Sequence, residues 1–357
     1  MKIVSIVGAR PQFIKAAPVS GELRKYHQEK LLHTGQHYDA KLSKIFFDDL
    51  KIPRPDLNLG VGSDSHARQT AEIMIGVESY LIQQKPDWVI IYGDTNSTLA
   101  GALATTKLHI RLAHVEAGLR SFNRRMPEEI NRIVADRVSN ILFCPTTAAV
   151  KNLQREGVSA GVHLVGDVMM DAAQQFVTVA EQKSRILEKL SLQPKQYFLL
   201  TLHRAENTDS EENMRNIVDA LTDSPEPIIF PVHPRTVKYL KQYKLFGRIQ
   251  MASNIVLADP VSFMDMIVLE KNAAKILTDS GGVQKEAYFY GVPCITLRDE
   301  TEWVETVADG WNCLVGANRT KITEAINNFA PGSPQQGHYG DGSASLKIRK
   351  VLENESS

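Results

Sequence analysis

Short apolar runs alternate along the whole chain with amphipathic segments of helical length, and this alternation constrains the fold more than any other feature. Consecutive parallel strands need a helical crossover between them, so the pattern is typical of βαβ units. In the first half we expect strands at Ile3–Val7, Leu31–Thr34, Trp88–Tyr92, Leu112–Val115 and Ile141–Cys144. The segments between them predict helices, most clearly at Phe13–Tyr26, Ala67–Gln84, Thr98–Thr106 and Ala148–Gly157.

The second half repeats this rhythm and predicts a second sheet, with strands at Phe198–Leu202, Pro227–Val232, Ile255–Leu257, Lys275–Thr278 and Pro293–Thr296. The sequence therefore predicts an α/β protein with two Rossmann-like domains in tandem. We expect an N-terminal domain over residues 1–167 and a C-terminal domain over residues 168–342, because a glycine turn and a long helix follow each other near the middle of the chain. A last helix within residues 343–357 is expected to join the N-terminal domain.

The charge balance and the apolar runs exclude several classes of protein. The 357 residues include 41 Lys and Arg and 41 Asp and Glu, so the formal net charge is zero, which argues against binding nucleic acid or an anionic membrane through bulk charge. We find neither a signal peptide nor an apolar run of roughly eighteen residues, the length a membrane span needs. Three scattered cysteines predict no disulfide framework. We therefore expect a cytoplasmic protein.

Two acidic residues lie just beyond expected strand ends, where open α/β sheets bind their ligands. Asp94 follows Gly93 after one strand, and Glu116 follows the next strand along the chain. Asp is also a common helix N-cap, and capping is the simpler interpretation of Asp94 on its own. The stretch His114–Arg132 packs further acids and arginines around Glu116, and this density favours a functional site.

A helix is expected to begin within that stretch at Pro127, a residue suited to the first helical position. Glu128 and Glu129 then occupy its first turn. The spacing of the apolar residues predicts a buried stripe made by Ile130, Ile133, Val134 and Val138. Glu128 falls nearly opposite this stripe and is expected to face a cleft, whereas Glu129 is expected to complement the helix dipole.

Glycine turns between a strand and a helix are candidate anion sites, because the first turn of a helix presents free N–H groups and a positive dipole. The turn at Gly8 adds the cations Arg10 and Lys15. This turn does not carry the spacing of a dinucleotide or Walker motif. A βα turn with surface cations is therefore an equal alternative to a phosphate site.

A second turn of this kind gives the more specific phosphate signal, because it pairs two glycines at the start of a helix. It is formed by Ser280, Gly281 and Gly282. The paired glycines favour a diphosphate site over a purely structural turn. Glu286, within the following helix, is expected to accept hydrogen bonds from a ribose.

His203 and Arg204 follow the first strand of the second half, where an imidazole beside a guanidinium can protonate or hydrogen-bond a phosphate leaving group. Glycine turns, cations and separated carboxylates together indicate a nucleotide-sugar held between two domains. We expect no cofactor, since no nicotinamide motif is present, and no metal, since His37 and Asp39 lack further ligands at suitable spacing. The chemistry that the carboxylates can still perform is proton transfer, coupled to breaking the glycosyl–phosphate bond.

At this point the motifs resemble one family, the non-hydrolysing UDP-N-acetylglucosamine 2-epimerases. The resemblance rests on Gly8-Ala-Arg-Pro11 with Lys15, Gly93-Asp94-Thr95, His114 to Arg120, Pro127 to Arg132, His203-Arg204, and Thr278 to Gln284 with Glu286. It runs from residue 1 to about Asp341. It implies a GT-B fold, a cleft between two Rossmann-like domains, and a homodimer.

The resemblance also implies a reaction, in which C2 of a UDP-2-acetamido sugar is inverted by elimination of UDP to a glycal and re-addition. It places Asp94, Glu116 and Glu128 around the sugar and gives His203 the task of assisting the departing UDP. UDP and substrate would be held by Arg10, Lys15, Arg132, Arg204, His233, Ser280, Gly281, Gly282 and Glu286. The residue that removes the C2 proton is left open among the carboxylates.

Departures from the family pattern point to one branch. Four motifs resemble most the enzymes acting on UDP-2,3-diacetamido-2,3-dideoxy-glucuronate: Gly8 to Lys15, Ser121 to Pro127, His203 to Asp209 and Arg298 to Glu305. Arg124 and Arg125 are expected to meet the additional C6 carboxylate of such a substrate. Many UDP-N-acetylglucosamine enzymes carry a basic residue and a glutamine where this chain has Tyr38 and Asp39. The sequence therefore does not predict the second, activating UDP-N-acetylglucosamine site of those enzymes.

Other functions stay open at the level of sequence. Interconversion of UDP-N-acetylglucosamine and UDP-N-acetylmannosamine is the alternative within the family. A GT-B glycosyltransferase shares the UDP turns but needs an acceptor, and a hydrolysing epimerase releases free sugar. A non-catalytic nucleotide-sugar sensor is the alternative from another class, and it predicts that Asp94→Asn or Glu116→Gln leaves function intact.

Overall fold

The computed structural model describes residues 1–36 and 53–356, so the positions expected at His37, Tyr38 and Asp39 lie outside the described residues. The chain divides into two compact units. Unit 1 contains Met1–Gln175 and Gly337–Ser357, and unit 2 contains Phe176–Gln336. The division falls inside a helix, whereas the sequence predicts a boundary before that helix, between residues 167 and 168.

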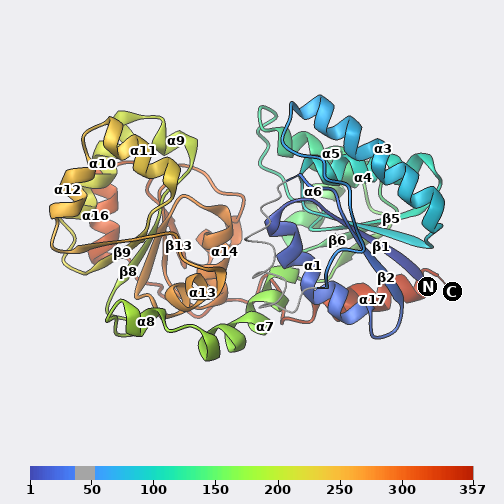
Figure 1. Ribbon diagram of the computed structural model, residues 1–357. Coiled ribbons are helices and arrows are strands. Elements are labelled where there is room, and N and C mark those ends of the chain that lie inside the picture. The colour runs from blue at the N-terminus through green and yellow to red at the C-terminus, as the bar shows by residue number, and fades with distance from the viewer. Residues whose placement is uncertain (37–52, 357) are drawn as a thin grey trace. The chain divides into compact units, whose positions relative to one another are not determined.

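Unit 1 is built on a seven-stranded parallel sheet with the order β3-β2-β1-β4-β5-β6-β7. Its strands are β1 (Lys2–Val7), β2 (Gln28–His33), β3 (Leu57–Asn58), β4 (Trp88–Tyr92), β5 (Arg111–Val115), β6 (Ile141–Cys144) and β7 (Val162–Leu164). Its helices are α1 (Arg10–Leu23), α3 (His66–Gln84), α4 (Asn96–Lys107), α5 (Pro127–Val138), α6 (Thr147–Arg155), the first part of α7 (Val168–Lys183), and α17 (Ala344–Asn354). Figure 1 shows α3, α4 and α5 on one face of this sheet and α1 and α17 on the other.

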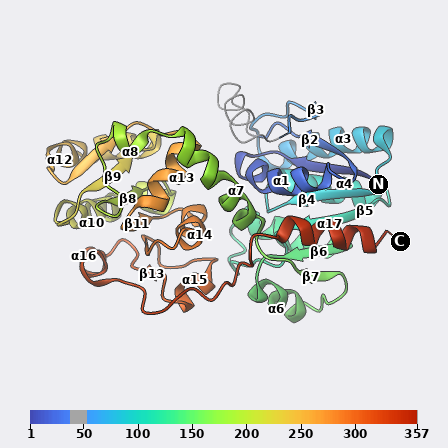
Figure 2. The same ribbon diagram turned by 90° about the horizontal axis from the view of Figure 1, so that it is seen from below.

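The last helix packs on unit 1, next to the first helix of the chain (Figure 2). Arg349 Nε of α17 donates to Glu22 Oε1 of α1 at 2.9 Å. Trp88 Nε1 donates to Ser356 Oγ at 2.8 Å, and Arg111 Nη1 donates to the carbonyl oxygen of Glu355 at 2.7 Å. The last residues of the chain are thus hydrogen-bonded to the first residues of β4 and β5.

Unit 2 repeats the arrangement with a six-stranded parallel sheet in the order β10-β9-β8-β11-β12-β13. The strands are β8 (Phe198–Thr201), β9 (Ile228–Pro231), β10 (Ile255–Ala258), β11 (Lys275–Thr278), β12 (Cys294–Thr296) and β13 (Asn312–Leu314). The helices are α8 (Ile186–Lys189), α9 (Ala205–Thr208), α10 (Glu211–Thr222), α11 (Pro234–Gln242), α12 (Phe246–Met251), α13 (Phe263–Asn272), α14 (Gly281–Phe289), α15 (Val304–Ala308) and α16 (Arg319–Asn328).

Both sheets have the Rossmann strand order, in which the first and fourth strands are neighbours and the order of the strands reverses between them. The switch lies between β1 and β4 in unit 1 and between β8 and β11 in unit 2. Ligands of such sheets bind at the carboxyl ends of the strands that flank the switch. Gly8 and Gly93 follow β1 and β4, and Leu202 and Asp279 follow β8 and β11, so both switches carry motifs that the sequence singled out.

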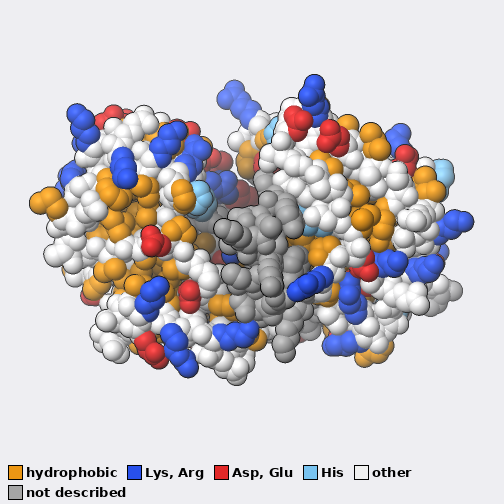
Figure 3. All heavy atoms as spheres, in the orientation of Figure 1, with side chains coloured by type: hydrophobic (Ala, Val, Ile, Leu, Met, Phe, Trp, Pro, Cys, Tyr) orange, Lys and Arg blue, Asp and Glu red, His pale blue; other side chains and the backbone are white. Residues whose placement is uncertain are grey.

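The strands expected from apolar runs are present, with ends shifted by at most a few residues. β3, β7 and β13 were not expected, because they are two or three residues long and mostly exposed or half-buried, which weakens the apolar signal. On the face drawn in Figure 3, basic and acidic side chains are interspersed over both units. None of the helices in the described ranges is both long and apolar enough to cross a membrane.

Candidate functional site

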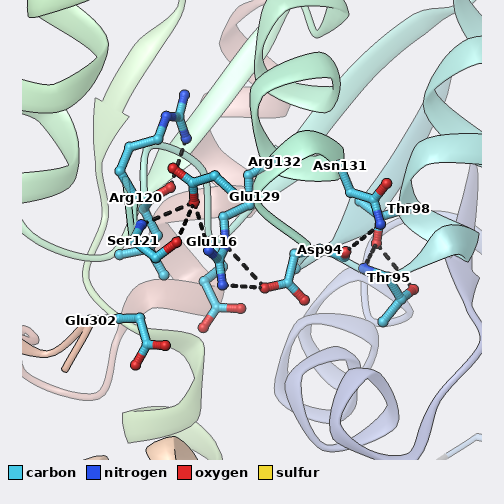
Figure 4. Close-up of polar contacts among 12 residues, drawn as sticks. Asp94, Thr95, Thr98, Glu116, Arg120, Ser121, Glu129, Asn131, Arg132 and Glu302 are labelled. Atoms are coloured by element: carbon cyan, nitrogen blue, oxygen red, sulfur yellow. Dashed lines mark hydrogen bonds and ion pairs between the residues drawn. The ribbon is translucent and has the colours of Figure 1, made fainter. Parts of the chain in front are cut away.

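The Asp94 turn leaves β4 at the switch of unit 1. Gly93 has a φ of +62°, in the left-handed region that favours glycine. Helix α4 is capped by Thr95, whose N–H donates to Thr98 Oγ1 at 3.1 Å, so capping does not explain Asp94. Instead, Asp94 Oδ2 accepts hydrogen bonds from Arg132 Nε at 3.0 Å and from Arg132 Nη2 at 2.7 Å (Figure 4).

Glu116 lies beside this turn with its carboxylate over Gly93. A Cβ built on Gly93 would lie 3.3 Å from Glu116 Oε2, and Lys15 Nζ of α1 forms an ion pair with the same oxygen. Glu116 is buried and has a φ of +73°, a conformation that costs a residue with a side chain about 1 to 3 kcal/mol. The N–H groups of Glu116 and Ala117 both donate to the carbonyl oxygen of Phe143 at 3.1 Å, which holds the turn in place.

Helix α5 presents its polar side to the unit, so the expected buried stripe is wrong. Ile130 is 43% exposed, and Ile133, Val134 and Val138 are only half-buried. The buried residues of α5 are Glu129, Asn131, Arg132, Ala135 and Asp136. Hydrophobic spacing fails here because the buried polar atoms find partners in the loops that follow β4 and β5.

Glu129 shows this most clearly, since it does more than complement the helix dipole. Its carboxylate accepts from Ser121 N at 2.9 Å, Ser121 Oγ at 3.0 Å, Phe122 N at 3.0 Å and Arg132 Nη1 at 2.9 Å (Figure 4). Burial raises the pKa of Glu129, but the hydrogen bonds from Ser121, Arg132 and Phe122 outweigh it and leave the pKa below its usual value. The carboxylate therefore fixes the start of the loop that continues to α5.

That loop carries the residues expected to recognise a substrate carboxylate. Arg124 and Arg125 are both exposed, and the N–H of Arg125 donates to Asn123 Oδ1 at 3.1 Å. Phe122 is 71% exposed and has a φ of +59°. Glu128 is exposed at the start of α5. These side chains are accessible to a ligand, whereas Glu129 beneath them is not.

Arg132 is expected to hold UDP or substrate, and in the structure its guanidinium lies between two carboxylates of unit 1. The hydrogen bonds described above engage Nε, Nη1 and Nη2 with Asp94 and Glu129. Burial lowers the pKa of Arg132, whereas Asp94 and Glu129 raise it, and the net direction is upward. This arrangement suits a group that orients Asp94.

The Gly8 turn does not offer its backbone N–H groups to a ligand. Gln12 Oε1 accepts from Gly8 N at 2.7 Å and from Ala9 N at 3.0 Å. Glycine is needed at position 8 because a Cβ there would lie 1.9 Å from Ser97 Oγ. Arg10 is exposed at the first residue of α1, and Lys15, further along the helix, is paired with Glu116.

At the switch of unit 2, Asp279 holds the His203–Arg204 turn. Asp279 is fully buried, and its Oδ2 accepts from the N–H groups of His203 and Arg204 at 3.1 and 2.9 Å and from Asn207 Nδ2 at 3.2 Å. The sequence analysis includes Asp279 in the Thr278 to Gln284 motif but gives it no role, because its partners in the His203–Arg204 turn are far away in the sequence. The arrangement fixes the backbone that precedes α9.

His203 lies at this turn with its ring centroid 5.9 Å from that of His233. Burial lowers the pKa of His203, the Asp279 carboxylate raises it, and charge at Arg204 and His233 lowers it, with a net decrease from the usual value. His233 is exposed as the N-cap of α11, where its Nδ1 accepts from Arg235 N at 3.2 Å. The structure thus brings His203, Arg204 and His233 to one end of the unit 2 sheet.

The N-terminus of α14 lies beside the same turn. No side chain in the described part of the chain caps this helix at Ser280, so its first N–H groups stay available to an anion. Gly282 is exposed, and a Cβ on Gly281 would lie 3.9 Å from Arg204 Nη2. Glu286 is half-buried further along the helix.

Glu302 and Trp303 also border this helix start, although the sequence analysis did not name them as site residues. A Cβ on Gly281 would lie 3.3 Å from Trp303 Nε1 and 3.7 Å from Glu302 Oε2. Arg298 Nη1 donates to Glu302 Oε2 at 3.2 Å. The signal available in the sequence was the acidic and aromatic run that follows β12, but nothing in its spacing links it to Gly281.

The chain matches one protein family over most of its length. A sequence model of the UDP-N-acetylglucosamine 2-epimerase family matches residues 22–353. The chain is 58% identical over 356 residues to a UDP-N-acetylglucosamine 2-epimerase homolog of Methanococcus maripaludis, covering 99% of this chain and 100% of the relative. It is 47% identical over 363 residues to a UDP-2,3-diacetamido-2,3-dideoxy-D-glucuronate 2-epimerase of Pseudomonas aeruginosa, covering 99% of each.

Among solved structures, the chain is similar to the UDP-GlcNAc 2-epimerase of Methanocaldococcus jannaschii in complex with UDP-GlcNAc and UDP. The TM-score is 0.88 at 44% sequence identity, covering 99% of this chain and 100% of that chain. Together with the two parallel sheets, this likeness confirms the expected GT-B fold with two Rossmann-like domains.

Proposed function

We propose that this chain, which belongs to the UDP-N-acetylglucosamine 2-epimerase family and is an isomerase, inverts C2 of a UDP-2-acetamido sugar through a glycal intermediate. The observation that carries the proposal is the pair of carboxylates at the switch of unit 1. Asp94 and Glu116 follow the ends of two neighbouring strands, and Glu116 Oε2 lies 3.3 Å from a Cβ built on Gly93, the residue before Asp94. Two acid/base groups at one place suit a reaction that moves a proton from one face of C2 to the other.

The reaction balances without an external reagent. A carboxylate removes the C2 proton, the electron pair forms the C1–C2 double bond, and the C1–O bond to UDP breaks with its electrons leaving on the diphosphate. In the reverse direction the diphosphate oxygen adds to C1 and a proton returns to the other face of C2. UDP is therefore both leaving group and nucleophile.

The groups of unit 1 have distinct tasks in this scheme. Arg132 fixes one oxygen of Asp94, and Lys15 is paired with Glu116, so both acids are held in defined orientations. Glu128 is the third acid/base group, placed on the first turn of α5. Arg10 and Lys15 are proposed to contribute positive charge toward the diphosphate.

The groups of unit 2 are proposed to hold UDP. The open N-terminus of α14 at Ser280, Gly281 and Gly282 suits the diphosphate, with Arg204 nearby. His203 and His233 are proposed to assist the leaving oxygen, and Glu286 to bind the ribose. The M. jannaschii relative solved with UDP-GlcNAc and UDP supports a UDP-sugar as the ligand.

The substrate that we favour is UDP-2,3-diacetamido-2,3-dideoxy-glucuronate, with UDP-N-acetylglucosamine as the alternative. Arg124 and Arg125 lie exposed on the loop that Glu129 anchors, and a guanidinium is well suited to a C6 carboxylate. The relative of P. aeruginosa named for this substrate supports the choice. A homodimer and a cytoplasmic location, expected from the sequence analysis, are part of the same proposal.

One experiment tests reaction and substrate together. The protein is incubated in D2O with each UDP-sugar, and the C2 position is followed by NMR. We expect loss of the C2 proton signal and growth of the manno epimer, faster for the diacetamido uronate. Exchange with UDP-N-acetylglucosamine alone, or at equal rates, contradicts the substrate assignment, and accumulation of free sugar contradicts the non-hydrolysing reaction.

A further inference from the structure

We propose that His114 and Asp136 form a positioning pair that holds the Asp94 turn and the Glu116 turn in one fixed geometry. The proposal rests on the proposed function, in which those two acids move the C2 proton. Neither His114 nor Asp136 has a role in the reaction described above. Both are buried, with His114 fully inaccessible and Asp136 2% exposed.

His114 connects α5 with the Asp94 turn. It lies in β5, and its Nδ1 is 2.7 Å from Asp136 Oδ1 while its Nε2 is 2.7 Å from the carbonyl oxygen of Gly93. Both neighbours are hydrogen-bond acceptors, so a ring that donates through both nitrogens satisfies both of them. The carbonyl that directly precedes Asp94 is thereby held by the strand that leads into Glu116.

Asp136 connects α5 with the other turn. Its Oδ2 accepts from the N–H of Gly118 at 3.1 Å and from Arg120 Nη1 at 2.7 Å. Gly118 has a φ of +80°, and a Cβ there would lie 2.5 Å from the carbonyl oxygen of Ala149, so this turn has little space in which to relax. Burial raises the pKa of Asp136, but His114 and Arg120 hold it below the usual range.

A structural role alone does not account for these residues. Buried polar groups of this kind are often no more stabilising than apolar residues of similar volume, because desolvation offsets their attraction. The pair links the two turns, since the Asp136 carboxylate contacts Gly118 directly and Gly93 through the His114 imidazole. The same helix also anchors Asp94 through Asn131 Nδ2, which donates to the Asp94 carbonyl oxygen at 2.9 Å.

The sharpest test compares His114→Gln with His114→Asn. The Gln amide nitrogen occupies the place of Nε2 and can still donate to Gly93, whereas the Asn amide occupies the place of Nδ1 and reaches only Asp136. We expect His114→Asn to lower kcat by about 10²-fold and His114→Gln by about tenfold, because misplacement of about 1 Å has effects of this size. KM is expected to change little, since neither variant replaces a residue proposed to hold UDP.

A second comparison tests Asp136→Asn, with Glu156→Gln as its matched control. Glu156 is the other carboxylate on Arg120, accepting from its Nε at 2.7 Å and from its Nη2 at 2.8 Å. We expect Asp136→Asn to lower kcat by about 10²-fold and Glu156→Gln to leave kcat unchanged, with melting temperatures recorded for every variant.

The outcomes separate the pair from the reaction. Equal kcat for His114→Gln and His114→Asn, or equal losses for Asp136→Asn and Glu156→Gln, overturns the positioning role. Absence of C2 proton exchange in the wild-type protein with both UDP-sugars overturns the proposed function, and the positioning role with it. If His114→Asn does not fold, the comparison of Asp136→Asn with Glu156→Gln decides alone.

Discussion

The guanidinium of Arg132 donates two hydrogen bonds to a single oxygen of the Asp94 carboxylate. Two donors on one oxygen hold the carboxylate in a fixed direction, which a flexible acid on a turn does not achieve. We therefore expect Arg132→Lys, which keeps the charge but loses the planar fork, to lower kcat by about tenfold to 10²-fold with little change in KM. Steady-state kinetics with Arg137→Lys as control, on the exposed side of the same helix, checks this; equal effects contradict it.

Asp94→Asn and Glu116→Gln should each abolish most C2 proton exchange. Each substitution removes an acid/base group while keeping a similar shape, so a loss of at least about 10²-fold in kcat is expected. UDP affinity, measured by calorimetry, should be nearly unchanged in Asp94→Asn, because Asp94 is not among the groups proposed to hold UDP. A protein that retains full function in both variants is a nucleotide-sugar sensor and not an enzyme.

UDP binding should be accompanied by proton uptake at His203. The pKa of His203 lies below its ordinary value of 6.5, because burial and neighbouring positive charge outweigh Asp279. A bound diphosphate places negative charge beside the ring and raises that pKa. Calorimetry of UDP binding near pH 6 in two buffers of different ionisation enthalpy measures the uptake, which His203→Gln should remove. Identical heats in both buffers contradict the placement of the diphosphate.

The same lowered pKa sets the sign of a stability effect. As the pH falls below 6.5, the unfolded chain protonates this histidine before the folded protein does, so this group makes folding less favourable toward acid. Below pH 6.5, the free energy of unfolding should therefore fall less steeply with decreasing pH in His203→Gln than in the wild-type protein. Urea denaturation at a series of pH values checks the sign, and a steeper decline in the variant contradicts it.

Arg124→Ala and Arg125→Ala should raise KM for the diacetamido uronate and leave KM for UDP-N-acetylglucosamine nearly unchanged. A charge-assisted hydrogen bond to a carboxylate contributes about 1.5 to 3 kcal/mol, which corresponds to roughly tenfold to 10²-fold in KM. Both arginines are exposed, so no loss of stability is expected. Equal shifts for both substrates assign these residues to the shared part of the UDP-sugar instead.

The strands and their order were predictable because parallel strands covered on both faces are continuous apolar runs. β4 and β11 were found with the ends expected from the sequence. The site motifs followed from the same logic, since they come directly after those strands. What spacing alone did not show was which polar atoms each turn uses internally, as at Gly8, whose N–H is taken by Gln12.

Helix α5 marks the limit of sequence periodicity. An apolar stripe normally faces the core, yet here Ile130 is outside and Arg132 and Asp136 are inside. Their partners, Asp94 and His114, lie far away in the sequence, so no local pattern announces the contacts. Each buried polar side chain of α5 has a hydrogen-bond partner. The helix can therefore bury its polar side, but the partners are known only once the loops are placed.

The two ends of the chain belong to the same unit, with α17 bound to α1 and Ser356 bound to Trp88. In covalent terms unit 2 is an insertion into unit 1. During synthesis the ribosome therefore completes unit 2 while unit 1 still lacks its last helix. A premature stop after Gln336 damages the half that was made first, and the half made last is left whole.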